Sequence, residues 1–162
     1  MEITVSPGWI SCLAAKPRTV LVGSNSSSCP SDSKIAFYYQ RPPTLRLQPG
    51  PSRSSVKTHR DSEYGHQDGE LNYWIPLTDP DLTNCTIWVE STPDQGDYHP
   101  MNVTHGQVAV FHGSACRHFV PMNQTIYTRM SLDFRVGVEG FFDGEWMMEG
   151  TTDDHFRRKV QV

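Results

Sequence analysis

The residues best suited to chemistry are a histidine and an aspartate two positions apart, His59 and Asp61, together with a histidine further along the chain. Two histidines and one carboxylate on one face of a metal ion can hold a redox-active iron(II) and leave its other positions open. Residues i and i+2 of a strand point to the same side, so His59 and Asp61 can reach one ion while Arg60 points elsewhere. The spacing therefore predicts a metal site at the end of a strand.

A second His-x-Asp triplet, His66 to Asp68, is an alternative to the first. It leads through Gly69 into an Asp-Gly turn signal ahead of the next strand, whereas His59 and Asp61 close an apparent strand at 55–58. Two copies of one motif cannot both be the site. The local context favours the first triplet and leaves the second open.

The third ligand has two nearby candidates, His112 and His118, with His99 and His105 as more distant ones. His118 lies in a strand-like segment just before a long alternating strand, so we expect it to face the same interior. His112 stands at an apparent strand end and turn, where a loop histidine or a partner of a ligand is the ordinary interpretation. His118 is the preferred ligand.

Arg129 and Ser131 share one face of the alternating strand, and Met130 faces away from them. A dicarboxylate needs a fixed cation and hydroxyl donors, and this pair supplies both. Taken alone, Arg129 could equally be an ordinary arginine on the outside of a barrel. The pair is a candidate anion clamp.

Short strands must position these side chains. Turn residues rich in Pro, Asp and Gly separate apolar alternating runs at intervals of about ten residues, which indicates a sandwich or barrel. The first 34 residues are polar and turn-rich, so we expect a flexible lead-in at 1–34 and one β-rich domain at 35–162. The strands are expected at 35–39, 44–48, 55–58, 70–77, 86–90, 99–103, 107–111, 117–121 and 126–136.

Composition narrows the function classes. The 162 residues suit a single domain, and 14 Lys and Arg against 18 Asp and Glu give a formal charge of −4. Such a balance does not predict a nucleic acid partner. No apolar run is long enough for a membrane span, and no convincing signal peptide precedes the domain, so we expect a cytoplasmic location.

Five segments resemble one known family. They are HRDSEYGHQ (59–67), ELNYWIPLT (70–78), NCTIWVES (84–91), HFVPMN (118–123) and TRMSLDFRV (128–136). Their order and spacing resemble the StrG-like branch of the iron(II)/2-oxoglutarate-dependent oxygenases, which are relatives of phytanoyl-CoA hydroxylase. The resemblance extends over about 38–138.

The resemblance implies a double-stranded β-helix, that is, a jelly-roll or cupin-like barrel. It implies that His59, Asp61 and His118 bind Fe(II), and that Arg129, eleven residues after His118, binds 2-oxoglutarate with help from Ser131 and Asn72. The implied reaction uses molecular oxygen to oxidise, and most simply to hydroxylate, a small-molecule substrate while 2-oxoglutarate becomes succinate and carbon dioxide. The protein mainly positions the reactants and tunes the metal.

Two rival functions stay open. A cupin-like metal-binding isomerase or epimerase would need no clamp at Arg129 and Ser131. A catalytically degenerate barrel could serve as a binding module, because family members usually carry a longer helical part before the barrel than the polar stretch present here. Release of succinate separates the oxygenase from both.

Overall fold

The structure, a computed structural model, describes residues 3–5, 36–53, 56–138, 140–146 and 156–161. The predicted mainly β class is confirmed, since strands make up nearly all of its regular elements. The elements are β1 Ile3–Val5, β2 Ala36–Arg41, β3 Thr44–Gln48, β4 Val56–His59, the 3₁₀ helix η1 Asp61–Tyr64, β5 Glu70–Pro76, α2 Pro80–Thr83, β6 Trp88–Val89, β7 His99–Pro100, β8 Val108–Phe111, β9 His118–Val120, β10 Arg129–Val138 and β11 Phe156–Gln161.

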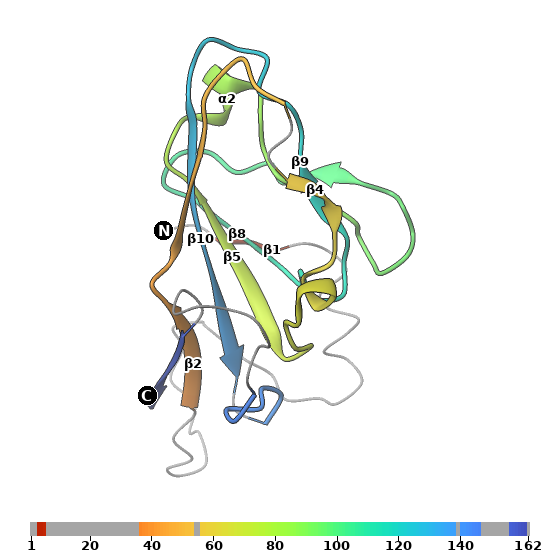
Figure 1. Ribbon diagram of the computed structural model, residues 1–162, viewed down its shortest axis with the longest axis vertical. Helices are drawn as coiled ribbons and strands as arrows, with labels where there is room; N and C mark the ends of the chain where they lie inside the picture. Colours follow the sequence, from red (N-terminus) through yellow and green to blue (C-terminus); the bar gives the residue numbers. More distant parts are fainter. Residues whose placement is uncertain (1–2, 6–35, 54–55, 139, 147–155, 162) are drawn as a thin grey trace, which may run out of the picture.

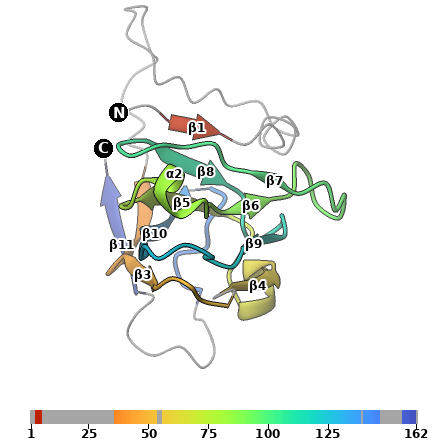
Figure 2. The same ribbon diagram turned by 90° about the horizontal axis from the view of Figure 1, so that it is seen from above.

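The strands form two sheets. The larger has the order β1-β8-β5-β10-β2-β11, with β3 also paired to β10, and the smaller has the order β4-β9-β6-β7. Neighbours are antiparallel except β1 and β8, which run parallel. The view from above shows β4, β6, β7 and β9 on one side of the molecule and β2, β3, β10 and β11 on the other (Figures 1 and 2). A chain with many short strands thus folds back into two layers rather than one open sheet.

The strand β10 is the centre of the larger sheet. Its first half pairs with β3, its last residues pair with β2, and β5 pairs with it along its other edge. Successive side chains of a strand point to opposite faces. Arg129, Ser131 and Arg135 are accordingly buried on the inner face, while Met130 on the outer face is 38% exposed. The predicted alternation therefore places a row of polar side chains inside the protein.

One predicted strand begins later than expected. The segment predicted as a strand from residue 126 becomes β10 only at Arg129. Before it, the Asn123 side chain accepts hydrogen bonds from the Thr125 amide and hydroxyl and donates to the Tyr127 carbonyl. An Asn side chain bonded to the backbone two residues on forms a turn that competes with strand pairing.

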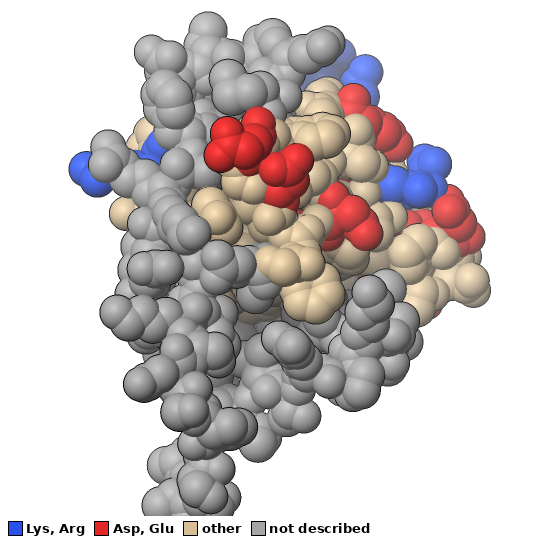
Figure 3. Space-filling view, turned by 90° about the horizontal axis from the view of Figure 1, so that it is seen from below, with Lys and Arg blue, Asp and Glu red and all other residues tan. Residues whose placement is uncertain are grey.

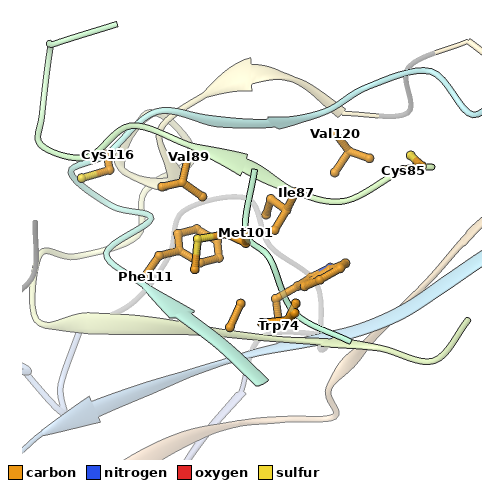
Figure 4. Close-up of a cluster of buried hydrophobic side chains, with 10 residues drawn as sticks. Trp74, Cys85, Ile87, Val89, Met101, Phe111, Cys116 and Val120 are labelled. Carbon is orange, nitrogen blue, oxygen red and sulfur yellow. The ribbon is translucent and has the colours of Figure 1, made fainter. Parts of the chain in front are cut away.

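The apolar core lies between the sheets (Figure 4). Trp74 from β5 and Phe111 from β8 contribute side chains from the larger sheet, and Val89 from β6 and Val120 from β9 contribute from the smaller. Burial of such side chains stabilises a fold by roughly 1.5 to 3 kcal/mol each. The core therefore holds together the two sheets that carry the polar residues described below.

The predicted lead-in at 1–34 lies outside the described residues except for β1, which runs alongside β8. None of the helices in the described ranges has the length and hydropathy needed to cross a lipid bilayer. On the face shown in Figure 3, Asp and Glu predominate over Lys and Arg among the described residues. That face therefore presents no continuous basic surface.

Candidate metal centre

The two sheet strands β4 and β9 bring His59 and His118 together. The two residues are direct partners in the antiparallel pairing, and their ring centroids are 4.4 Å apart. The backbone of Arg60 is extended, with φ −106° and ψ 147°, and η1 begins at the next residue. The Arg60 side chain pairs with Asp94, while Asp61 is buried. Pairing across two strands and one extended residue thus explain why these three side chains meet.

The three side chains have the arrangement of a metal site. Oδ1 of Asp61 lies 3.4 Å from Nε2 of His59 and 3.4 Å from Nε2 of His118. One donor atom from each residue lies within 4.8 Å of the other two. Bonds of about 2.1 Å at right angles would place neighbouring donors about 3 Å apart. The donor set therefore fits a first-row metal ion after small movements.

A backbone carbonyl oxygen fixes the orientation of each of the two histidine rings. Nδ1 of His59 lies 2.6 Å from the Lys57 carbonyl oxygen, and Nδ1 of His118 lies 3.1 Å from that of Cys116. A carbonyl oxygen can only accept, so each Nδ1 carries a hydrogen, and Nε2 is the ring nitrogen that faces Asp61 and could bind a metal ion. This second hydrogen bond is the usual support of a metal-binding histidine.

Electrostatics keep the carboxylate charged. Burial alone would raise the pKa of Asp61, but its contacts with His118, His59 and Arg135 outweigh burial and hold that pKa well below its usual range. Burial alone would lower the pKa of His59, but its hydrogen bonds to Asp61 and the Lys57 carbonyl outweigh burial and raise it. In the metal-free protein Asp61 is therefore an anion, and a proton on His59 is stabilised where a metal ion would compete for it.

The other oxygen of Asp61 faces the larger sheet. Its Oδ2 accepts from Nδ2 of Asn72 at 2.6 Å and from Nε and Nη2 of Arg135 at 2.9 and 2.7 Å. Asn72 was predicted to contact the co-substrate, and the structure places its amide against Asp61. Since Asn72 pairs with Arg135, it lies six residues of β10 from Arg129, which is about 20 Å of strand.

Arg129 is a buried cation whose donors are mostly unused. Its exposed fraction is 2%, and its only described hydrogen bond runs from Nη2 to Oγ of Ser131 at 3.1 Å. Its Nε and Nη1 are buried without a hydrogen-bond partner, and no ion pair between described residues involves it. Burial lowers the pKa of Arg129, and its guanidinium carbon lies 5.5 Å from the Trp74 ring centroid. A buried, unpaired guanidinium is costly and is suited to an anionic ligand.

Two further charges link the metal centre to Arg129. Arg46 and Asp133 form an ion pair of 2.6 Å between β3 and β10. Burial alone would lower the pKa of Arg46, but Asp133 and, more weakly, Asp61 outweigh burial and raise it. Arg129 in turn interacts electrostatically with Arg46 and Asp133. The metal donors and the unpaired guanidinium therefore lie within electrostatic reach of the same ion pair.

The alternative His-x-Asp triplet does not form a cluster. His66 is buried with Nδ1 2.8 Å from Oε2 of Glu70, whereas the Asp68 side chain is 87% exposed. His112, the other candidate for the distal ligand, has Nε2 2.6 Å from the Asp68 carbonyl oxygen. In the described residues these groups stabilise a loop and do not join His59, Asp61 and His118.

Sequence reasoning did not assign a role to Arg135. The alternation of β10 put Arg135 on the same face as Arg129 and Ser131, which was the available signal. Its partners Gln40, Glu70 and Asp61 come from three separate elements. No local pattern connects those positions, so its role became visible only in the folded chain.

No family model matches this chain. Its sequence is similar to the streptomycin biosynthesis protein StrG of Streptomyces griseus, with 38% identity over 104 residues. These residues make up 64% of this chain and 48% of StrG, so the chain spans about half the length of that curated relative.

Solved structures share the fold. A non-heme monooxygenase, ThoJ in complex with nickel, superposes with a TM-score of 0.51 and 23% identity, over 74% of this chain and 54% of ThoJ. SnoN, a non-heme alpha ketoglutarate dependent epimerase from nogalamycin biosynthesis, superposes with a TM-score of 0.51 and 17% identity, over 75% of this chain and 58% of SnoN. At these identities the two structures show a common fold.

Proposed function

We propose that the chain is a non-haem Fe(II)/2-oxoglutarate-dependent dioxygenase of the StrG-like branch, built on a double-stranded β-helix. It oxidises, most simply by hydroxylation, a small molecule and releases succinate and carbon dioxide. The observation that carries this proposal is the unpaired, buried Arg129, on the same face of β10 as the arginine that holds Asp61. A metal site alone would not need a second, unsatisfied cation within reach.

His59, Asp61 and His118 would hold the iron ion. Their donors are two imidazole nitrogens and one carboxylate oxygen, and all three side chains are buried or partly buried. Iron(II) in such a set supplies open coordination positions for a keto acid and for oxygen. The chain's own contribution is to keep Asp61 anionic and to orient both Nε2 atoms toward its carboxylate.

Arg129 and Ser131 would bind the distal carboxylate of 2-oxoglutarate. Two buried donors of Arg129, Nε and Nη1, have no partner among the described residues, and each can donate to a carboxylate oxygen. The Ser131 hydroxyl, fully buried, already orients the third nitrogen. Asn72 would act in the same site through Asp61, since it donates to that carboxylate.

The charges of the site match these two ligands. The buried carboxylates of Asp61 in η1 and Glu70 in β5 balance the charges of the buried Arg129 and Arg135 in β10. A dication and a dianion bound together leave that balance unchanged, whereas either one alone would place net charge in a buried site. We therefore expect each ligand to strengthen the binding of the other.

An anaerobic titration tests the proposal. Iron(II) and 2-oxoglutarate are added to the protein, and chelation of the metal by the keto acid produces a visible charge-transfer absorption band. The band is expected with the wild type and is expected to be absent with Asp61→Asn, the control that removes the anionic ligand. Absence of the band in the wild type, with iron bound, would contradict the oxygenase assignment and favour a metal-binding isomerase without a co-substrate.

The fold shared with the epimerase SnoN gives a second candidate outcome. An epimerase of that kind and a hydroxylase would share the same site. Both outcomes are separated by the mass of the product, because hydroxylation adds an oxygen atom and epimerisation does not. Absence of succinate release would favour either a metal-binding isomerase or a catalytically degenerate binding module over the oxygenase.

A further inference from the structure

The two oxygens of the Asp61 carboxylate have different surroundings. Oδ1 faces the two histidines at 3.4 Å, whereas Oδ2 accepts three hydrogen bonds, one from Asn72 and two from Arg135. A carboxylate oxygen has about two lone-pair sites, so Oδ2 is saturated. Only Oδ1 has lone pairs free for a metal ion.

The donors to Oδ2 are themselves fixed. Arg135 donates from Nη1 to Oε1 of Gln40 at 3.2 Å, and its Nε lies 3.9 Å from Oε2 of Glu70. Gln40, Glu70 and Arg135 are each at most 5% exposed and come from β2, β5 and β10. The guanidinium therefore cannot follow a rotation of the Asp61 carboxylate, and the carboxylate is held in one orientation.

Asn72 is held against Asp61 by close packing. A Cβ atom at Gly113 would lie 2.6 Å from Nδ2 and 2.7 Å from Cγ of Asn72, so only a glycine leaves room for the amide. The Gly113 carbonyl also accepts the Asp61 amide at 2.8 Å. The backbone at Gly113 thus positions both the ligand and the side chain that donates to it.

We propose that Arg135 and Asn72 are positioning residues that restrict Asp61 to a single coordinating oxygen; this inference rests on the proposed function. A carboxylate that binds through both oxygens takes one more position on the ion than a carboxylate that binds through one. Two histidines and a single oxygen leave three of six positions open, enough for a chelating keto acid and oxygen together. With both carboxylate oxygens bound, one of these reactants would lose its place.

The test counts open positions on a bound Mn(II) ion. Solvent-proton relaxation per bound Mn(II) is proportional to the number of exchangeable water ligands. Replacing Arg135 with Met frees Oδ2 to bind the ion, so relaxation per bound ion should fall by about a third, from three waters to two. Arg129→Met is the matched control, since it removes the other buried arginine from the same face of the same strand and should leave the water count unchanged.

The affinity for Mn(II) distinguishes a positioning role of Arg135 from a merely structural one. Removing a cation beside Asp61 does not weaken the attraction between the carboxylate and a metal ion, so Mn(II) should bind Arg135→Met as tightly as the wild type or more tightly. A merely structural role would weaken Mn(II) binding and leave the relaxation per bound ion unchanged. That combination, or unchanged relaxation with unchanged affinity, would overturn the inference.

Two milder variants keep the test decisive if Arg135→Met does not fold. Arg135→Lys keeps the charge but lacks the planar pair of donors, and Asn72→Ala removes one donor to Oδ2. Each should lower relaxation per bound ion, and full relaxation in both would overturn the inference. Failure of the wild type to bind any Mn(II) would instead overturn the proposed function itself.

Discussion

The two buried arginines of β10 differ in how completely they are paired. Arg135 uses Nε, Nη1 and Nη2 in hydrogen bonds to Asp61 and Gln40, whereas among the described residues Arg129 has one hydrogen bond and its Nε and Nη1 have no partner. They lie on the same face of one strand and are 5% and 2% exposed. A fully paired buried charge positions other groups, and an unpaired one is prepared for a ligand. In the proposed function, Arg135 belongs to the metal end of the site and Arg129 to the co-substrate end.

The largest expected effect is at the ligand that Arg135 holds. Asp61→Asn keeps the shape of the side chain and removes its charge, so turnover to succinate should be lost. Metal affinity should fall at least about a hundredfold, because Asp61 carries the negative charge of the donor set and the neutral amide does not attract a dication in the same way. Competition with a chromophoric chelator measures the affinity, and thermal unfolding of the metal-free proteins is the control. Retained succinate release by Asp61→Asn would refute the ligand assignment.

Stability of the metal-free protein should separate the two arginines. Arg135→Met removes the buried cation that donates to the Asp61 carboxylate, which should lower the free energy of unfolding by about 3 to 5 kcal/mol. Arg129→Met removes a buried cation that has no carboxylate partner, so it should leave stability unchanged or increase it. Urea unfolding of the two variants and the wild type measures both changes in the free energy of unfolding. Equal destabilisation by both substitutions would contradict the distinction between Arg135 and Arg129.

The affinity for 2-oxoglutarate should instead depend on Arg129. Arg129→Leu should weaken 2-oxoglutarate binding by more than about tenfold, since charge-assisted hydrogen bonds contribute roughly 1.5 to 3 kcal/mol. Metal binding should be nearly unaffected, because Arg129 contacts none of the three metal donors. Calorimetric titration of 2-oxoglutarate into the metal-loaded variant measures the loss. Unchanged affinity would place the co-substrate carboxylate elsewhere.

The smallest expected effect is on pH dependence. The raised pKa of His59 stabilises the metal-free fold fully below its unfolded pKa of about 6.5, and this stabilisation is lost as pH rises through the folded pKa. The lowered pKa of Asp61 acts in the acid range, where stability present above about pH 3.9 is lost as pH falls through the folded pKa. Melting temperatures of the metal-free protein, measured from pH 5 to 9, should therefore decline as pH rises from about 6.5 through the folded pKa of His59. Bound metal, which displaces the proton, should remove that decline.

Much of the fold and part of the site could be predicted from local patterns. The strand at Thr44–Gln48 has its predicted bounds, and the polar face of β10 follows from the two-residue period of its side chains. Strand ends were less predictable. The start of β10 depended on hydrogen bonds to the Asn123 side chain, and the short helix α2 lies between the strands that were predicted at 70–77 and 86–90.

The sequence by itself determined which side chains could share a face. His59 and Asp61 are two residues apart, and Arg129, Ser131 and Arg135 are separated by even numbers of residues. The two-residue period of a strand therefore places the members of each set on one face, independently of the tertiary structure. Only the tertiary structure decided between the two His-x-Asp triplets, because antiparallel pairing placed His118 opposite His59 and left Asp68 exposed. It also decided the different roles of the two arginines. Partners for Arg135 come from β2, β5 and η1, and a side chain's charge is satisfied by groups near in space, which may be distant in sequence.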